Sequence, residues 1–523
     1  MKRLLCVVLA ASSPAALLGA CAHHADRPVV AQPVVVQPAS PAPSPAPKAE
    51  AHPNSAAPRT VVEAPRVPRD RDIPTEGAAR PFALPKPERT RLACGAELLV
   101  VRRTRLPLAT LLVVWPVGGT QDPACRAGLA SFTADLLTNG AGQRPSIELA
   151  TEIERIGARL ESDSTWDSTL LSLTTLTTKL DPALMLLADV VLRPRFDAEE
   201  VERVRSESVT RLAQLRDQAA TQAALAGARA VYGKDHRYGQ LVQGSAAGLG
   251  AITRDELVAW HHDRLPVARA TVIAVGDIDL QTLRKKLDRA FGKVRSSGRG
   301  AAVGVAVPAG AAVPPEAPAR KRQIVLVDRP GAAQTEIRAF EPGPPRSSPD
   351  YFALTVLNTI FGGNFSSRLN GKLREEKGYT YGARSEFAFR RDGGPFSAGA
   401  PVKTAVTRAA LVDFLAELDR LRLGDVNDRE LALAKATLQR SLARQFETPT
   451  QVASSLAAIT VFGLPADYFA TYAAKVGAVT AADITRAAAA LHPSDMSLVF
   501  VGDEKVIGGE LEALVGPYTL VTP

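Results

Sequence analysis

The chain has 523 residues, 46% of them hydrophobic, which is enough to bury more than one core and predicts at least two domains. Its net charge of +9 comes mostly from arginines spread thinly along the chain, and aromatic residues make up only 5%. Since no Lys/Arg-dense block is interleaved with aromatics, we expect no nucleic-acid partner, although the charge would suit anionic lipid headgroups equally well.

Residues 1–21 have the pattern of a targeting signal. Lys2 and Arg3 give a charged start, Leu4–Leu18 form an apolar stretch too short to span a membrane, and small residues precede Cys21. This ending resembles a bacterial lipoprotein signal, whose cysteine becomes the lipidated first residue of the mature chain. The alternative is an ordinary secretion signal in which Cys21 is incidental. We therefore expect an exported chain that is lipid-anchored through Cys21 to the bacterial cell envelope, at the outer membrane and facing the periplasm.

Composition then divides the chain. Residues 22–82 are rich in Ala, Pro and Val, a composition that favours extended conformations and predicts a tether. A second Ala/Gly/Pro stretch, residues 298–319, predicts a linker. It separates a domain of residues 83–297 from a domain of residues 320–507, and residues 508–523 follow as a tail.

The two domains have the marks of an internal duplication. Leu98–Val101 and Ile324–Val327 open them as expected strands, 226 positions apart. Gly276 and Gly502 follow the last expected strands and are again 226 positions apart. An equal offset at both ends indicates paired homologous domains.

Within each copy, strands alternate with helices. In the first, Leu108–Trp115 and Leu170–Thr178 are β-prone, and Asp197 with Glu200 favours the start of a long helix over residues 198–226.

In the second copy, Ser348 is expected to cap a helix that has Pro349 in its first turn and ends at Gly362. Mixed strands and helices with hairpin-like strand pairs indicate an α+β fold.

Two cysteines remain in the globular part, Cys94 and Cys125. Export permits a disulfide between them, but the sequence alone leaves this open.

The segment Gly128–Ala141 is similar to the metal-site helix of the insulinase/pitrilysin peptidase family. That family carries an inverted zinc motif, H-x-x-E-H, in which two histidines one turn apart hold the metal and the glutamate is the general base. On this frame Ser131 and Asp135 occupy the histidine positions, and Ala134 occupies the glutamate position.

The family's remaining zinc ligand is a glutamate about eighty residues later, and its position falls on Arg211. Glu207, one turn away, fits only if the register is shifted. The resemblance therefore implies that this chain binds no zinc. The histidines of the globular part do not rebuild a site: His236 lies in a loop that the family also has, His261 and His262 are expected at a solvated helix end, and His492 stands apart.

Asp135 and Arg211 carry opposite charges at positions that converge on the metal in the family. We predict that they pair across the former site, since a lone buried charge is costly. The alternative is that both face solvent and never meet.

The segment Ser366–Tyr381 resembles the part of the family that supplies an Arg and a Tyr to hold the substrate carbonyl, and Arg374 and Tyr381 fall on these positions. A guanidinium and a phenol can both donate hydrogen bonds to a carbonyl or developing oxyanion. The alternative is ordinary ion pairing and packing.

The resemblance spans residues 85–507 and implies two homologous insulinase-type domains, each a mixed sheet covered by helices, in a clamshell-like arrangement. In bacterial two-subunit members of the family, one chain carries the zinc motif and the other the Arg/Tyr pair. This chain is similar to the second type. The resemblance thus implies a non-catalytic, peptide-binding subunit in a heterodimer with a zinc-bearing homologous peptidase subunit, acting on peptide substrates.

Two alternatives remain. One is a structural or binding protein without a peptidase role. The other is an active zinc peptidase with an unconventional site built from Glu207, His236 or Asp135.

Overall fold

The structure, a computed structural model, describes residues 86–292 and 322–522. The expected signal (1–21), tether (22–82) and linker (298–319) lie outside these residues. No helix in the described ranges is long and apolar enough to cross a membrane.

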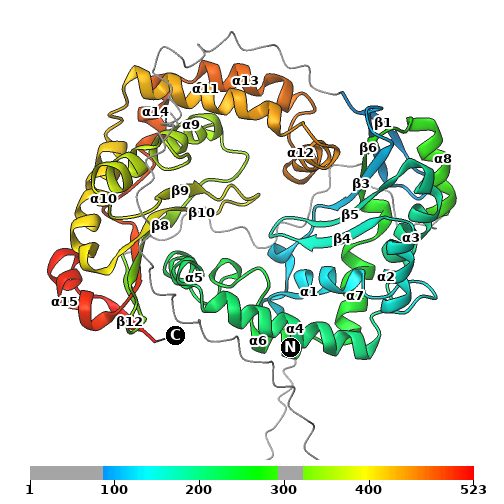
Figure 1. Ribbon diagram of the computed structural model, residues 1–523, viewed down its shortest axis with the longest axis horizontal. Coiled ribbons are helices and arrows are strands. Elements are labelled where there is room, and N and C mark those ends of the chain that lie inside the picture. Colours follow the sequence, from blue (N-terminus) through cyan, green and yellow to red (C-terminus); the bar gives the residue numbers. More distant parts are fainter. Residues whose placement is uncertain (1–85, 293–321, 523) are drawn as a thin grey trace, which may run out of the picture. The chain divides into compact units, whose positions relative to one another are not determined.

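The first half holds a mixed sheet with strand order β1-β2-β6-β3-β5-β4, in which β2 and β6 are parallel and the other neighbours antiparallel. Its strands are β1 (Glu88–Arg91), β2 (Glu97–Arg102), β3 (Leu108–Trp115), β4 (Arg159–Ser164), β5 (Thr169–Leu176) and β6 (Thr271–Gly276). Its helices are α1 (Leu129–Leu137), α2 (Ser146–Arg155), α3 (Leu180–Leu192), α4 (Ala198–Arg216), α5 (Ala219–Tyr232), α6 (Ala246–Ala251), α7 (Arg254–Arg264) and α8 (Leu280–Phe291) (Figure 1).

The second half repeats this plan with strand order β12-β7-β11-β8-β10-β9. Its strands are β7 (Ile324–Asp328), β8 (Gln334–Pro342), β9 (Arg384–Phe387), β10 (Pro395–Lys403), β11 (Ser497–Gly502) and β12 (Thr519–Val521). Its helices are α9 (Tyr351–Phe361), a π-helical segment (Asn370–Glu376), α10 (Thr407–Arg422), α11 (Asp428–Arg444), α12 (Pro449–Phe462), α13 (Tyr468–Ala478), α14 (Ala481–Ala488) and α15 (Glu504–Val515).

The strand order confirms the duplication. Strands β2, β6, β3, β5 and β4 of the first sheet correspond in order to β7, β11, β8, β10 and β9 of the second. Only the outermost strand differs, since β1 precedes β2 and runs antiparallel to it, whereas β12 comes from the chain's end and runs parallel to β7. Residues 508–523, expected as a tail, therefore include the end of α15 and an edge strand of the second sheet.

Each half covers one face of the other half's sheet. Helix α5 of the first half packs on β7, β8 and β11, and α12 of the second half packs on β3 and β6 (Figure 1). Leu99 and Val101 of β2 lie in one hydrophobic cluster with residues of α12, and the matching Val325 and Val327 of β7 cluster with α5. The same strand positions in both copies thus face a helix supplied by the other half.

The long helix expected over residues 198–226 is instead two helices, α4 and α5, separated by Asp217 and Gln218. Neither a proline nor a glycine marks this break. The reason is tertiary, because α5 departs to pack on the second sheet. At the break, Arg329 of the second half donates a hydrogen bond to the Asp217 carbonyl at 2.5 Å.

The helix expected after Ser348 begins later than the sequence indicates. Its first residue is Tyr351, so Pro349 precedes the helix, and Ser348 accepts a hydrogen bond from the Asp350 amide through its hydroxyl. The predicted end is confirmed, with Phe361 as the last helical residue and Gly362 following it.

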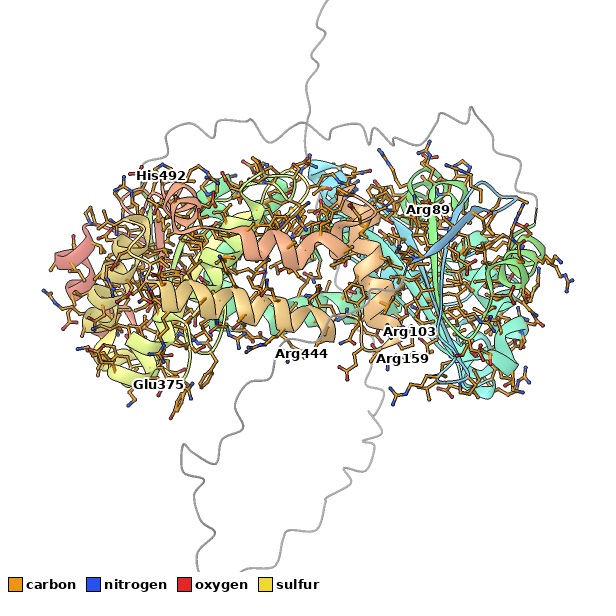
Figure 2. The ribbon with its side chains drawn as sticks, turned by 90° about the horizontal axis from the view of Figure 1, so that it is seen from above. Arg89, Arg103, Arg159, Glu375, Arg444 and His492 are labelled. Carbon is orange, nitrogen blue, oxygen red and sulfur yellow. The ribbon has the colours of Figure 1, made fainter. Side chains whose placement is uncertain are left out.

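The turn between β9 and β10 joins the halves by polar contacts. Arg391 donates to the carbonyls of Pro116 and Val461, and its amide donates to a carboxylate oxygen of Asp167 at 3.1 Å. Arg390 lies over the Trp166 ring, 4.8 Å from its centroid. Arg103, labelled in Figure 2, adds a hydrogen bond to the carbonyl oxygen of Glu447.

Candidate functional site

Helix α1 carries the three positions that the sequence aligns with a zinc motif. Its start is fixed by Gly128, whose φ of +96° and close approach to the Gln243 carbonyl leave no room for a side chain. The Asp122 carboxylate accepts hydrogen bonds from the amides of Gly128 and Ala130. Burial raises the pKa of Asp122 to about 7 although these hydrogen bonds oppose the rise.

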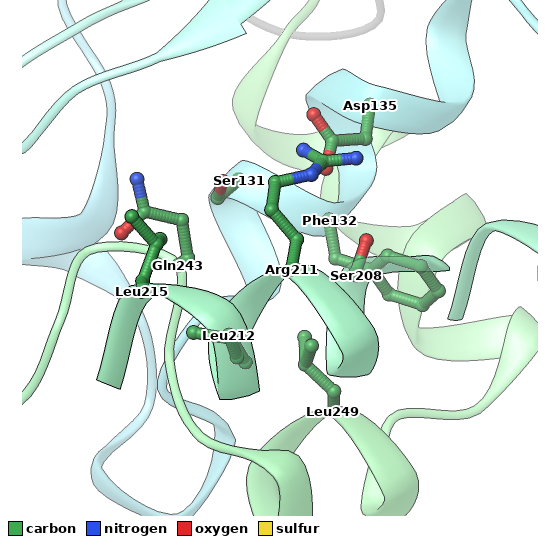
Figure 3. A pocket seen from close by; sticks show the side chains of 9 residues that line it. All are labelled: Ser131, Phe132, Asp135, Ser208, Arg211, Leu212, Leu215, Gln243 and Leu249. Atoms are coloured by element: carbon green, nitrogen blue, oxygen red, sulfur yellow. The ribbon is translucent and has the colours of Figure 1, made fainter. Parts of the chain in front are cut away.

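Ser131 and Asp135 project from α1 one turn apart towards α4, and Ala134 is fully buried. Helix α4 packs on α1 and brings Arg211 to the same place. In Figure 3, Arg211 extends from α4 so that its guanidinium lies beside the Asp135 carboxylate.

The predicted ion pair is present, with 3.6 Å between Nη1 of Arg211 and Oδ2 of Asp135. It is only partly shielded, because the Arg211 side chain is 53% exposed and that of Asp135 27%. Burial raises the pKa of Asp135, while Arg211 and the Ser208 hydroxyl lower it and the charge of Asp163 adds to the rise.

Little space remains between the two helices. The cavity has a volume of about 10 Å³, room for about one water molecule. It is lined by Ser131, Phe132, Asp135, Ser208, Arg211, Leu212, Leu215, Gln243 and Leu249. Ser208 lies one turn before Arg211, so helical spacing from Arg211 would have indicated it, whereas Gln243 and Leu249 come from a loop and a helix that the motif does not include.

These residues do not fit a zinc ion. Zinc sites use imidazole, thiolate or carboxylate ligands, and here only Asp135 offers one. The Arg211 guanidinium, a permanent cation, occupies the place of another ligand and would repel the metal. Ala134 has no group that could act as a base towards a bound water.

The other residues proposed for an unconventional metal site make contacts of a different kind. Glu207 is exposed and pairs with Arg203 at 2.6 Å. His236 accepts a hydrogen bond from the Tyr238 amide through Nδ1, and its ring stacks on Tyr232. In the described ranges, no group of three or more His, Cys, Asp or Glu side chains could hold a metal ion.

His261 does not lie at a solvated helix end as expected. Its Nε2 is 3.0 Å from the Val191 carbonyl oxygen and its ring meets Phe196 edge-on. Burial lowers the pKa of His261. His262 does face solvent, with Nδ1 2.8 Å from Asp263. The prediction failed for His261 because α7 turns that side towards α3.

Arg374 and Tyr381 flank the end of the π-helical segment. The Arg374 guanidinium lies over the Phe365 ring, 4.1 Å from its centroid, and is 3.4 Å from a carboxylate oxygen of Glu375. Tyr381 follows the segment and is 87% exposed. Phe365 is itself 70% exposed, so the rings of Phe365 and Tyr381 are both accessible.

The cysteines are not joined. Cys94 is a buried free thiol whose pKa burial raises, and Cys125 is an exposed free thiol.

Known protein families match both halves of the chain. The family description "Insulinase (Peptidase family M16)" matches residues 99–232, and "Peptidase M16 inactive domain" matches residues 251–438. Together the two matches span more than half of the chain.

Individual proteins agree with these matches. The chain is 29% identical over 394 residues to an uncharacterized zinc protease of Mycobacterium bovis, covering 73% of this chain and 86% of the relative. Its fold resembles the peptidase M16 inactive domain from Pseudomonas fluorescens, with a TM-score of 0.71 at 24% identity over 80% of this chain and 98% of that one. A protease from Helicobacter pylori gives a TM-score of 0.70 at 19% identity over 80% of this chain and 100% of that one. At these identities the two solved structures show the fold.

Proposed function

Because this chain belongs to the insulinase family, peptidase family M16, we propose that it is a non-catalytic, peptide-binding subunit that acts with a zinc-bearing homologous chain. The peptide bond is then cleaved at the zinc of that partner. This chain contributes groups that bind and orient the substrate.

The observation that carries the proposal is the ion pair of Arg211 with Asp135 on the helices aligned with the family's zinc site. A guanidinium and a carboxylate occupy two ligand positions, and the methyl group of Ala134 occupies the position of the general base. A chain with these residues needs another chain to supply the metal and the base.

Arg374 and Tyr381 supply the substrate-binding chemistry. The Arg374 guanidinium contacts the Phe365 ring and can donate hydrogen bonds to a peptide carbonyl. The exposed Tyr381 hydroxyl can donate to the same oxygen or to an oxyanion that develops there. Neither group needs to change its protonation state in this role.

The proposed location rests on the signal-like pattern of residues 1–21. Cys21, after a short apolar signal, would carry a lipid anchor, and residues 22–82 would hold the globular part away from the membrane. The complex would then process peptides at the bacterial cell envelope.

The test compares the purified chain, a purified H-x-x-E-H homologue from the same genome, and their mixture, on a quenched-fluorescent peptide library, with zinc content measured for each chain. We expect cleavage in the mixture, zinc only in the homologue, and no cleavage by this chain alone. Tyr381→Phe, which removes one hydroxyl, should lower cleavage by the mixture about tenfold or more, as should Arg374→Ala.

Arg384→Ala is the matched control, because Arg384 is exposed on the neighbouring strand β9 and its loss should leave cleavage unchanged. Zinc and cleavage with this chain alone would overturn the proposal. Cleavage that does not depend on Arg374 or Tyr381 would reject their assigned role, and silence of the mixture would favour a structural protein.

A further inference from the structure

An open groove of about 420 Å³ lies where α11 meets α12, in the second half of the chain. The end of α11 forms one wall with Ser441, Arg444 and Gln445. These residues share one face of the helix because they lie one turn apart. Arg444, labelled in Figure 2, brings a guanidinium to this wall.

The first turns of α12 form the other wall. They contribute Thr450, Gln451, Ser454 and Ser455. Val452, which lies two positions after Thr450 and thus on the opposite side of the helix, is fully buried in the hydrophobic cluster. Helix α12 therefore buries one side in the core and turns a polar side to the groove.

Hydrogen bonds hold both walls in place. The Ser455 hydroxyl donates to the Gln445 carbonyl at 3.3 Å and so joins the two helices. The Gln451 side-chain oxygen accepts hydrogen bonds from the amide and the hydroxyl of Thr448, each at 2.9 Å. This arrangement orients the Gln451 side chain and leaves its Nε2 group as a donor for a ligand. Less ordering is then needed when a ligand binds.

Arg444 carries the only charge among the residues that line the groove, since the others bear hydroxyl or amide groups. Its side chain is exposed. In the part of the chain that the structure describes, no carboxylate lies within ion-pairing distance of it, including that of Glu447 in the connection between the two helices. A guanidinium without a partner, beside neutral hydrogen-bonding groups, favours an anionic ligand with oxygen acceptors.

The opposite charge lies to one side of the groove. A smaller cavity of about 220 Å³ shares Thr450 and Ser454 with the groove and extends to Glu161 and Asp163 of β4. An anionic group in the groove is therefore attracted towards Arg444 and repelled from β4. These charges determine the end of the groove at which an anionic group binds.

The lining also distinguishes between classes of anionic ligand. No aromatic ring is among the residues that line the groove, so a nucleobase has no surface on which to stack. One guanidinium matches the single charge of a carboxylate better than the larger charge of a phosphate group. The volume admits an acidic side chain together with adjoining peptide backbone, whose amide groups the neutral side chains can bind.

We infer that the groove between α11 and α12 is a subsite for an aspartate or glutamate side chain of a bound peptide. Arg444 binds the carboxylate through two N–H groups, and Gln451 and Ser454 donate hydrogen bonds to the carboxylate or to the backbone beside it. The inference rests on the proposed peptide-binding function and adds a preference for acidic peptides.

The test measures fluorescence anisotropy of two labelled octapeptides with blocked termini, titrated with the full chain at low salt. The peptides differ only in one central residue, glutamate or glutamine. We expect the glutamate peptide to bind about fivefold more tightly, with the preference falling at about 0.5 M salt. Arg444→Gln should reduce the preference to less than about twofold, and Arg444→Glu should reverse it, because a carboxylate then faces a carboxylate.

Arg429→Gln is the matched control, because Arg429 is an exposed arginine of the same helix that does not line the groove, and the variant should keep the preference. Equal binding of both peptides to the unaltered chain would overturn the inference, as would a preference that survives Arg444→Gln or that Arg429→Gln abolishes equally. Equal cleavage of both peptides by the mixture with the zinc-bearing homologue, without preferential binding, would reject the acidic-peptide subsite and leave the proposed function intact. A chain that binds neither peptide, in a mixture that cleaves neither, would reject both.

Discussion

Gly227 of α5 faces Phe340 of β8 so closely that a Cβ at position 227 would lie 2.2 Å from the ring carbons of Phe340. This glycine allows a helix of the first half to lie on the sheet of the second half. Its role is steric, because a methyl group there would overlap a buried ring.

Gly227→Ala should therefore destabilise the protein by about 1 to 3 kcal/mol, since α5 must lift or the Phe340 ring must shift. Chemical denaturation, followed by circular dichroism, measures this change. Gly250→Ala is the matched control, because no heavy atom lies within 4 Å of a Cβ built at that helical position, and it should be neutral or stabilising by up to about 1 kcal/mol. Equal effects of the two substitutions would contradict the packing argument.

Restoring the family's ligands should restore metal binding. The variant Ser131→His, Ala134→Glu, Asp135→His, Arg211→Glu places imidazoles one turn apart on α1 and a carboxylate on α4. We expect zinc to raise its stability by about 3 kcal/mol at a concentration 100 times its Kd, and to have no effect on the unaltered chain.

A triple variant that keeps Arg211 provides the control for this prediction. The guanidinium remains at the metal position, so zinc should stabilise the triple variant much less than the quadruple one. Thermal melts with and without zinc report both. Equal stabilisation of the two variants would show that Arg211 does not occupy the ligand position.

Glu341 should make stability fall as pH rises. Burial raises the pKa of Glu341 from 4.5 to about 7, although the His492 amide donates to its carboxylate. Below pH 4.5 the carboxyl is protonated in both states, whereas between pH 4.5 and 7 only the folded protein keeps the proton. Raising the pH through this window therefore costs stability, by about 3 kcal/mol in total at one carboxyl.

Glu341→Gln removes this contribution. The free energy of unfolding of the variant, relative to that of the unaltered protein, should therefore rise by about 3 kcal/mol between pH 4.5 and pH 7.5. Urea denaturation at several pH values measures the difference. Glu386→Gln, an exposed carboxylate of β9, should show no such gain. A difference between Glu341→Gln and the unaltered chain that does not change with pH would refute the assignment.

The local sequence pattern and the equal spacing of the strands were sufficient to predict much of the fold. Leu108–Trp115 is a strand with the predicted ends, and the offset of 226 positions holds for the strands that open and close both halves. The opposite charges of Asp135 and Arg211 were enough to predict their contact, since a family frame had already brought these positions together.

The features of the fold and the site that the sequence did not predict depend on contacts between segments far apart in the chain, which no local pattern encodes. The break after Arg216 lacks any helix-breaking residue because docking of α5 on a distant sheet determines it. His261 was expected to be solvated because it lies at the end of a helix shortly before Pro266, yet it contacts Val191 and Phe196. The cavity beside Asp163 has no local sequence pattern for the same reason, since α12 forms one of its sides.

Because α5 and α12 each pack on the sheet of the other half, they also set the order in which the chain can finish folding. The strands of the first sheet are all synthesised by residue 276, but the helix that shields their second face ends only at Phe462. Until then Leu99, Val101 and their neighbours on that face stay open to water or to other chains. The first half therefore stays incompletely folded until almost the whole of the second half has been synthesised.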